Sequence, residues 1–130
     1  FEARQVMVRI EQSTSPLLAG MAGSKLPIAV SHGEGRASVA PESLQQLNAV
    51  NAIAMRYADD HGGIASQYPQ NPNGSVEGIA GVCSDDGRVT IMMPHPERVF
   101  RSVQNSWAPA EWSEDGGWLR LFRNARMMLG

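Results

Sequence analysis

The chain has 130 residues, of which 42% are hydrophobic and 18% are charged, and its formal net charge at pH 7 is −2. This length suits one domain with a real core, and the composition excludes an intrinsically disordered chain. The small net charge gives no general reason to bind nucleic acid or an anionic membrane, and no apolar run approaches the ~20 residues that span a bilayer.

Three strands are predicted in the first half of the chain. Residues 5–10 alternate polar and apolar side chains, which is typical of a strand with one buried face. Residues 25–32 form a continuous apolar run of the kind that is buried on both faces. A third strand is expected within residues 51–63, where two aspartates and two glycines form the turn that ends it.

Short helices and loops are predicted between these strands. Residues 13–21 combine a Ser/Thr cluster with a proline that suits the first turn of a short helix. Residues 40–49 predict a second short helix, with Pro41 in its first turn. Residues 32–36, HGEGR, form a glycine-spaced turn after the second strand, and residues 68–75, YPQNPNGS, predict a loop.

A hairpin, a loop and a final helix are predicted in the second half. Residues 78–83 and 88–93 are apolar strands joined by the turn sequence SDDG. Residues 106–117 are acidic, contain two tryptophans and predict an irregular surface loop. The tail from residue 118 predicts an amphipathic helix. Its packing face is expected to carry Trp118, Leu121, Phe122, Ala125, Met128 and Leu129, and its polar face Arg120, Arg123 and Asn124.

One histidine in the stretch IMMPHPERVF, residues 91–100, is held between two prolines. Pro96 disfavours the helical conformation at His95, and Pro94 fixes its own φ. In an extended segment alternate side chains share a side, which places Glu97 beside His95. A carboxylate at one imidazole nitrogen leaves the other nitrogen free to act as a base. The spacing fits the base and the orienting group of a nucleophilic triad, or a pair that only satisfies a turn.

Cys83 is the only thiol in the chain. It cannot form an internal disulfide, which favours a reducing, cytoplasmic compartment. A nucleophile elbow needs a small residue two places after the nucleophile, and Asp85 stands there instead. We therefore expect Cys83 to be a small buried apolar residue and not the nucleophile.

Four motifs together resemble a known family. They are FEAR at residues 1–4, HGEGR at 32–36, NPNGS at 71–75 and PHPER at 94–98. With this spacing the chain resembles the carboxy-terminal half of the glutaminase domain of the large, bacterial-type phosphoribosylformylglycinamidine synthases. The resemblance implies a flavodoxin-like, triad-type glutamine amidotransferase fold, α/β with a mostly parallel central sheet flanked by helices. Residues 1–130 would be the C-terminal half of that domain, with the N-terminal half missing.

The resemblance also implies a role for each residue of the pair. His95 would be the base and Glu97 the orienting carboxylate of a Cys–His–Glu triad that hydrolyses glutamine. The family's cysteine lies upstream of the FEAR region, so the isolated chain is expected to be inactive. Ammonia would pass to a separate synthetase domain that binds ATP and magnesium, with no cofactor in this chain. The implied partners are that synthetase and the N-terminal part of the glutaminase domain.

Other residues and two other functions stay open. His32 would lie near the glutamine pocket, or would only satisfy loop carbonyls. The three tryptophans at 107, 112 and 118 are expected to contact the synthetase. A non-catalytic interaction module is one alternative function. A small metal-dependent hydrolase is the other, since His32 and Glu34 repeat the His-x-Glu spacing of His95 and Glu97.

Overall fold

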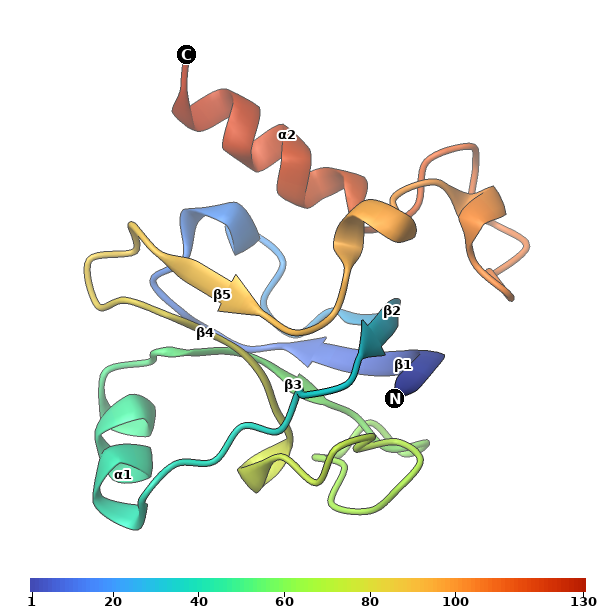
Figure 1. Ribbon diagram of the computed structural model, residues 1–130. Coiled ribbons are helices and arrows are strands. Elements are labelled where there is room, and N and C mark those ends of the chain that lie inside the picture. Colours follow the sequence, from blue (N-terminus) through green and yellow to red (C-terminus); the bar gives the residue numbers. More distant parts are fainter.

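Five antiparallel strands form one curled sheet in the computed structural model, which describes all residues 1–130 (Figure 1). The strands are β1 (Glu2–Ile10), β2 (Lys25–His32), β3 (Ile53–Tyr57), β4 (Ile79–Cys83) and β5 (Thr90–Met92). They lie in the order β2-β1-β3-β4-β5, and every neighbouring pair is antiparallel. All five correspond to strands that the sequence predicts.

The prediction of a mostly parallel central sheet is wrong for these residues. A parallel pair needs a long crossover connection, usually a helix, whereas β4 and β5 are joined by the short turn that the sequence predicts. The apolar run of β2 is also typical of a strand in the middle of a parallel sheet. Instead β2 lies at the edge, with Ile28 and Val30 in the core and Lys25 exposed. The flavodoxin-like fold of the whole domain stays a prediction.

The two edges of the sheet are joined beyond β5. The backbone N–H of His95 donates to the carbonyl of Ala29 on β2 at 2.8 Å, and the two residues form an isolated antiparallel bridge. The sheet therefore curls until the segment after its last strand meets its first edge. The core inside this curl is made of buried apolar side chains, among them Val6, Val8, Ile10, Ile28, Val30, Met55, Tyr57, Val99, Trp118 and Leu121.

The C-terminal helix α2 (Leu119–Met128) packs on the short 3-10 turn η1 (Pro16–Leu18). Asn124 is buried there and donates two side-chain hydrogen bonds, to the carbonyls of Leu17 at 2.9 Å and Ala19 at 3.0 Å. The prediction that Asn124 lies on the solvent face is therefore wrong. Two predicted packing residues, Met128 at the end of α2 and Leu129 directly after it, are exposed instead. No helix of the chain has the length and apolar content to cross a bilayer.

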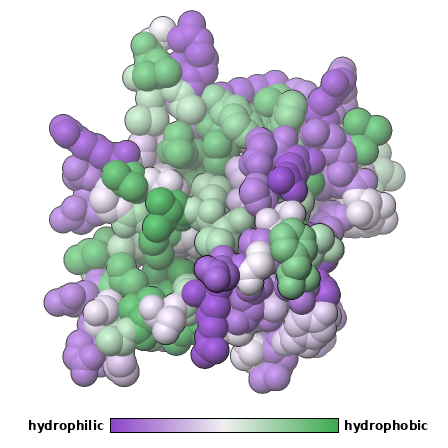
Figure 2. All heavy atoms as spheres, viewed as in Figure 1, coloured by the Kyte–Doolittle hydropathy of each residue, from purple (hydrophilic) through white to green (hydrophobic).

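The helix α1 (Pro41–Ala49) lies at the opposite end of the sheet from α2 and buries none of its residues (Figure 1). An open, mainly apolar groove of about 320 Å³ separates Leu47 on α1 from β4 and β5. Figure 2 shows hydrophobic side chains over this part of the molecule, where Ile91 of β5 is 61% exposed. The apolar face beside α1 has no partner within residues 1–130.

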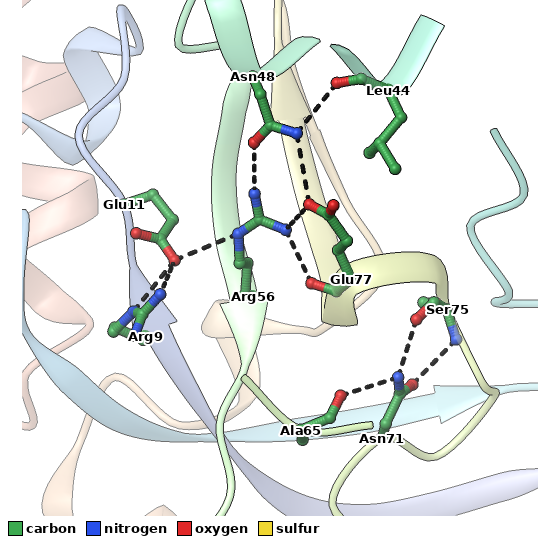
Figure 3. A network of polar contacts seen from close by, with 9 residues as sticks. All are labelled: Arg9, Glu11, Leu44, Asn48, Arg56, Ala65, Asn71, Ser75 and Glu77. Carbon is green, nitrogen blue, oxygen red and sulfur yellow. Dashed lines mark hydrogen bonds and ion pairs between the residues drawn. The ribbon is translucent and has the colours of Figure 1, made fainter. Parts of the chain in front are cut away.

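The helix α1 buries no apolar side chain, and polar contacts of a buried arginine hold it against the sheet instead (Figure 3). Arg56 of β3 donates to the side chain of Asn48 on α1 at 2.8 Å. It also donates to the Glu77 carboxylate at 3.0 Å and lies 3.4 Å from the Glu11 carboxylate. A buried charge is tolerated only where such partners replace water, so this network holds α1 against β1 and β3.

The three tryptophans differ in their surroundings. Trp118 is fully buried, and its indole N–H donates to the carbonyl of Pro27 on β2 at 2.7 Å. Trp112 is half-buried, and Trp107 is 69% exposed. The prediction that Trp118 makes an external contact is therefore wrong, because it is a core residue that anchors α2 to the sheet.

We expect Trp118→Phe to lower the free energy of unfolding by about 1–3 kcal/mol, because it leaves the buried carbonyl of Pro27 without a donor. Urea denaturation followed by circular dichroism measures the change. Trp107→Phe is the matched control, since that indole is exposed and its loss is expected to change stability by no more than ~0.5 kcal/mol. Equal losses in the two variants would contradict the anchoring role of Trp118.

Candidate active site

The local sequence places His95 where the curled sheet closes. Pro94 is buried, and His95 takes a φ of −110° and a ψ of 88° ahead of Pro96. This is the non-helical backbone that a following proline imposes. Pro96 then begins the 3-10 turn η3 (Pro96–Arg98), which directs Glu97 back towards the histidine. The prediction of an extended segment is wrong at Glu97, but the turn brings the two side chains together all the same.

His95 and Glu97 form a close hydrogen-bonded pair. The distance from His95 Nδ1 to Glu97 Oε1 is 2.7 Å. Because an ionised carboxylate can only accept, Nδ1 carries the proton in this pair, and in the neutral ring Nε2 then keeps its lone pair. The His95 side chain is 30% exposed and that of Glu97 is 55% exposed, so the pair lies at the surface. The arrangement leaves Nε2 able to take a proton from a nucleophile.

The surroundings of Glu97 keep its carboxylate ionised. Partial burial opposes ionisation, but the hydrogen bond from His95, a backbone N–H and the charges of His95 and Arg98 outweigh it and lower the pKa of Glu97. The Arg98 guanidinium lies 3.9 Å from the same carboxylate oxygen. Glu97 is therefore a hydrogen-bond acceptor at neutral pH, as the orienting group of a triad must be.

His32 lies on the other side of β2 from this pair. His95 is bridged to Ala29, and side chains alternate along a strand, so His32 three residues on faces the opposite way. Its ring is buried under Gly35, where an added Cβ would come within 2.6 Å of Nδ1, and the amide of Asn73 donates to that nitrogen at 3.4 Å. These contacts join the HGEGR turn to the NPNGS loop. A substrate-binding role for His32 stays a prediction.

Cys83 has the surroundings of a core residue. It is 7% exposed at the end of β4, and the chain continues through a turn into β5. Its Sγ lies 3.4 Å from the hydroxyl of Thr14 and 3.6 Å from the carbonyl of Ala52. A thiolate needs a basic group or a helix N-terminus to stabilise it, and neither is among these partners.

The two His-x-Glu clusters do not combine into a metal centre. No three His, Cys, Asp or Glu side chains in the chain are grouped so that they could hold one ion. Known zinc sites take three or four protein ligands. The arrangement of the side chains therefore gives no support to a metal-dependent hydrolase.

Sequence reasoning missed the residues that hold the pair in place. Ala29 binds the backbone of His95 through its carbonyl, and no sequence pattern indicates that this strand residue meets a segment far along the chain. Arg98 follows Glu97 directly and could have been found from its charge next to a candidate triad carboxylate. Both are positioning residues, because neither touches Nε2 of His95.

Two comparisons relate the chain to known proteins. A family model described as a CobB/CobQ-like glutamine amidotransferase domain matches residues 1–129. The solved structure of PurLQS from Thermotoga maritima is similar, with a TM-score of 0.65 and 26% sequence identity. The match covers 99% of this chain and 48% of that chain, so the chain spans about half the length of the related one.

Replacing His95 with alanine is expected to raise the pKa of Glu97, because the hydrogen bond and charge that favour its ionised form are lost. The folded-state pKa of Glu97 lies below its unfolded value. The pair therefore stabilises the fold above the unfolded pKa, and this contribution is lost as the pH falls through the folded pKa. Carbon-13 NMR of the side-chain carboxyl measures the shift.

The control for this titration is Asp86, whose pKa is lowered by the hydroxyl of Ser84 and the backbone N–H of Arg88. The pKa of Asp86 is expected to stay the same in His95→Ala. If the pKa of Glu97 also stayed the same, the hydrogen bond between the two side chains would not exist in solution.

Proposed function

The chain belongs to the CobB/CobQ-like glutamine amidotransferase domain family, and we propose that His95 and Glu97 are the base and orienting group of its glutamine-hydrolysing triad. The observation that carries this proposal is the 2.7 Å contact between His95 Nδ1 and Glu97 Oε1. It selects the tautomer in which Nε2 accepts a proton, and it provides a negative charge beside the imidazolium that then forms.

The proposed reaction is acyl transfer through a thioester. Nε2 of His95 takes the proton of a cysteine thiol outside residues 1–130, and the thiolate attacks the side-chain carbonyl carbon of glutamine. The imidazolium returns the proton to the nitrogen as the carbon–nitrogen bond breaks, which releases ammonia. His95 then takes a proton from water as the water oxygen attacks the thioester carbon. The carbon–sulfur bond breaks, which releases glutamate, and the imidazolium returns its proton to the cysteine sulfur. Glu97 stabilises the imidazolium at each of these steps.

The proposed parent protein is a phosphoribosylformylglycinamidine synthase of the large, bacterial type, acting in the cytoplasm. The similarity to PurLQS and the motif PHPER support this assignment. The ammonia would convert formylglycinamide ribonucleotide to the amidine in a synthetase domain that binds ATP and magnesium. Because the chain spans half of the related chain and Cys83 is unsuited as the nucleophile, residues 1–130 alone are expected to be inactive.

Glu97→Gln in the complete protein is expected to lower glutamine-dependent synthesis by about 10²–10⁴-fold, because an amide cannot stabilise the imidazolium. Ammonia-dependent synthesis should be unchanged, since it bypasses the glutaminase. Steady-state assays with each nitrogen source measure both rates. Asp85→Asn, which removes an exposed carboxylate from the β4–β5 turn, is the control and should retain both. Normal glutamine-dependent synthesis in Glu97→Gln would favour a non-catalytic interaction module.

A glutamine-mimicking diazoketone is expected to label the complete protein at a cysteine outside residues 1–130. Such reagents alkylate an activated thiolate, whereas Cys83 is buried against a hydroxyl and a carbonyl. Peptide mass spectrometry locates the adduct, and the isolated chain should carry none. An adduct on Cys83 in either sample would show that this thiol is the nucleophile.

A further inference from the structure

A trough of about 400 Å³ crosses the face of β1 that points away from the core. Val6 and Val8 of this strand face the core. Side chains alternate along a strand, so Gln5 and Met7 face the other way. Met7 lies opposite Pro27 of β2, and these residues form the floor of the trough. Its walls come from the loops that follow β3 and η4 (Ser102–Gln104).

The trough and the catalytic pair open on the same side of the sheet. Gln5 pairs with Ala29 on β2, and Ala29 pairs in turn with His95. Directly opposite residues of antiparallel strands project to one face, so the three side chains form a row. Two strand spacings separate the ends of this row, which places the backbones of Gln5 and His95 about 10 Å apart. A partner seated in the trough would therefore lie beside His95.

Trp107 is held in an exposed position at the edge of the trough. Gln5 accepts a hydrogen bond from the backbone N–H of Ser106 at 3.1 Å, and its amide donates to Asn105 at 3.5 Å. These bonds fix the loop that carries Trp107, whose side chain is 69% exposed. An exposed indole on an ordered loop loses little freedom on binding, and tryptophan is enriched among residues that dominate interface affinity.

The charge available at the trough is negative. Asp60 lines its wall, makes no salt bridge, and receives only the amide of Gln70 at 3.4 Å. Arg4 also lines it, but its guanidinium bonds to Glu2 and stacks on the ring of Tyr68 at 4.7 Å from the centroid. A partner segment that complements this surface carries apolar side chains for the floor and a lysine or arginine opposite Asp60.

We propose that this trough is the docking surface for the protein or domain that consumes the ammonia. The proposal rests on the glutaminase function proposed above, because only a released small molecule gives a reason for the consumer to lie beside His95. Ammonia that enters water is protonated and diluted, so the consumer must cover the side on which His95 opens. The mixed polar and apolar lining of the trough is typical of contacts between domains. The groove beside α1 is more apolar, although Glu34, Arg36 and Ser38 also line it.

The proposal predicts uncoupling without loss of chemistry in the complete protein. Trp107→Ala and Asp60→Lys are expected to release glutamate at close to the normal rate while product formation from glutamine falls about tenfold. Ammonia-dependent synthesis should be unchanged. The molar ratio of glutamate released to product formed measures the effect. Val103→Ala is the matched control, because Val103 is 85% exposed on the neighbouring turn but does not line the trough. A normal ratio in both trough variants would overturn the proposal.

Photo-crosslinking tests the contact directly and does not depend on catalysis. With p-benzoylphenylalanine in place of Trp107, we expect a crosslink to a peptide of the ammonia-consuming part, and none with the same probe in place of Val103. A crosslink only to the rest of the glutaminase domain, or none, would overturn the docking surface. If Glu97→Gln abolishes glutamine use while the crosslink fails, only the docking surface is wrong. If glutamine use survives Glu97→Gln, the proposed function is wrong.

Discussion

The hydrogen bond from the N–H of His95 to the carbonyl of Ala29 is the constraint on which the site depends. It joins the two edges of the curled sheet, and it fixes the backbone of the candidate base at the seam. The flanking prolines limit the conformations of the segment, and Glu97 fixes the imidazole ring. Different contacts thus hold the backbone of His95, the segment that leads to it and its side chain. A reactive group is kept in position in this way before substrate arrives.

The two open surfaces of the sheet, the groove beside α1 and the trough over β1, differ in their chemistry. Beside α1, Leu47 and the strands β4 and β5 line a groove that is mainly apolar, and Arg56 holds α1 in place through a hydrogen bond to Asn48 and an ion pair with Glu77. Over β1 the trough mixes Met7 and Trp107 with Asp60. Apolar surface open to water is unfavourable, and large apolar faces of this kind are typical of permanent contacts. The mixed surface suits a contact that must form and align correctly, since charge gives orientation.

The sequence predicts the strands and the contact between His95 and Glu97 because both depend on local patterns. Alternation and apolar runs locate β1 to β5, and a proline after His95 restricts the histidine whatever the fold. Strand direction is not local, since the apolar run of β2 is the same in a parallel sheet and at an antiparallel edge. The prediction that Asn124 lies on the solvent face is wrong for a similar reason. Its acceptors are carbonyls of η1, which lie beside α2 only after the chain has folded.

The His95–Glu97 pair is exposed to water, so its geometry and its reactivity have different origins. With 30% of the His95 side chain and 55% of the Glu97 side chain in water, their electrostatic attraction is screened. The geometry is complete in residues 1–130, because β2, the prolines and η3 supply it. The low-dielectric surroundings that strengthen such a pair come only when other surfaces and the substrate cover it. The same covering brings the nucleophile to Nε2 in the proposed triad. Residues 1–130 therefore hold the candidate base in position, and in the proposed triad the surfaces that cover it would make it reactive.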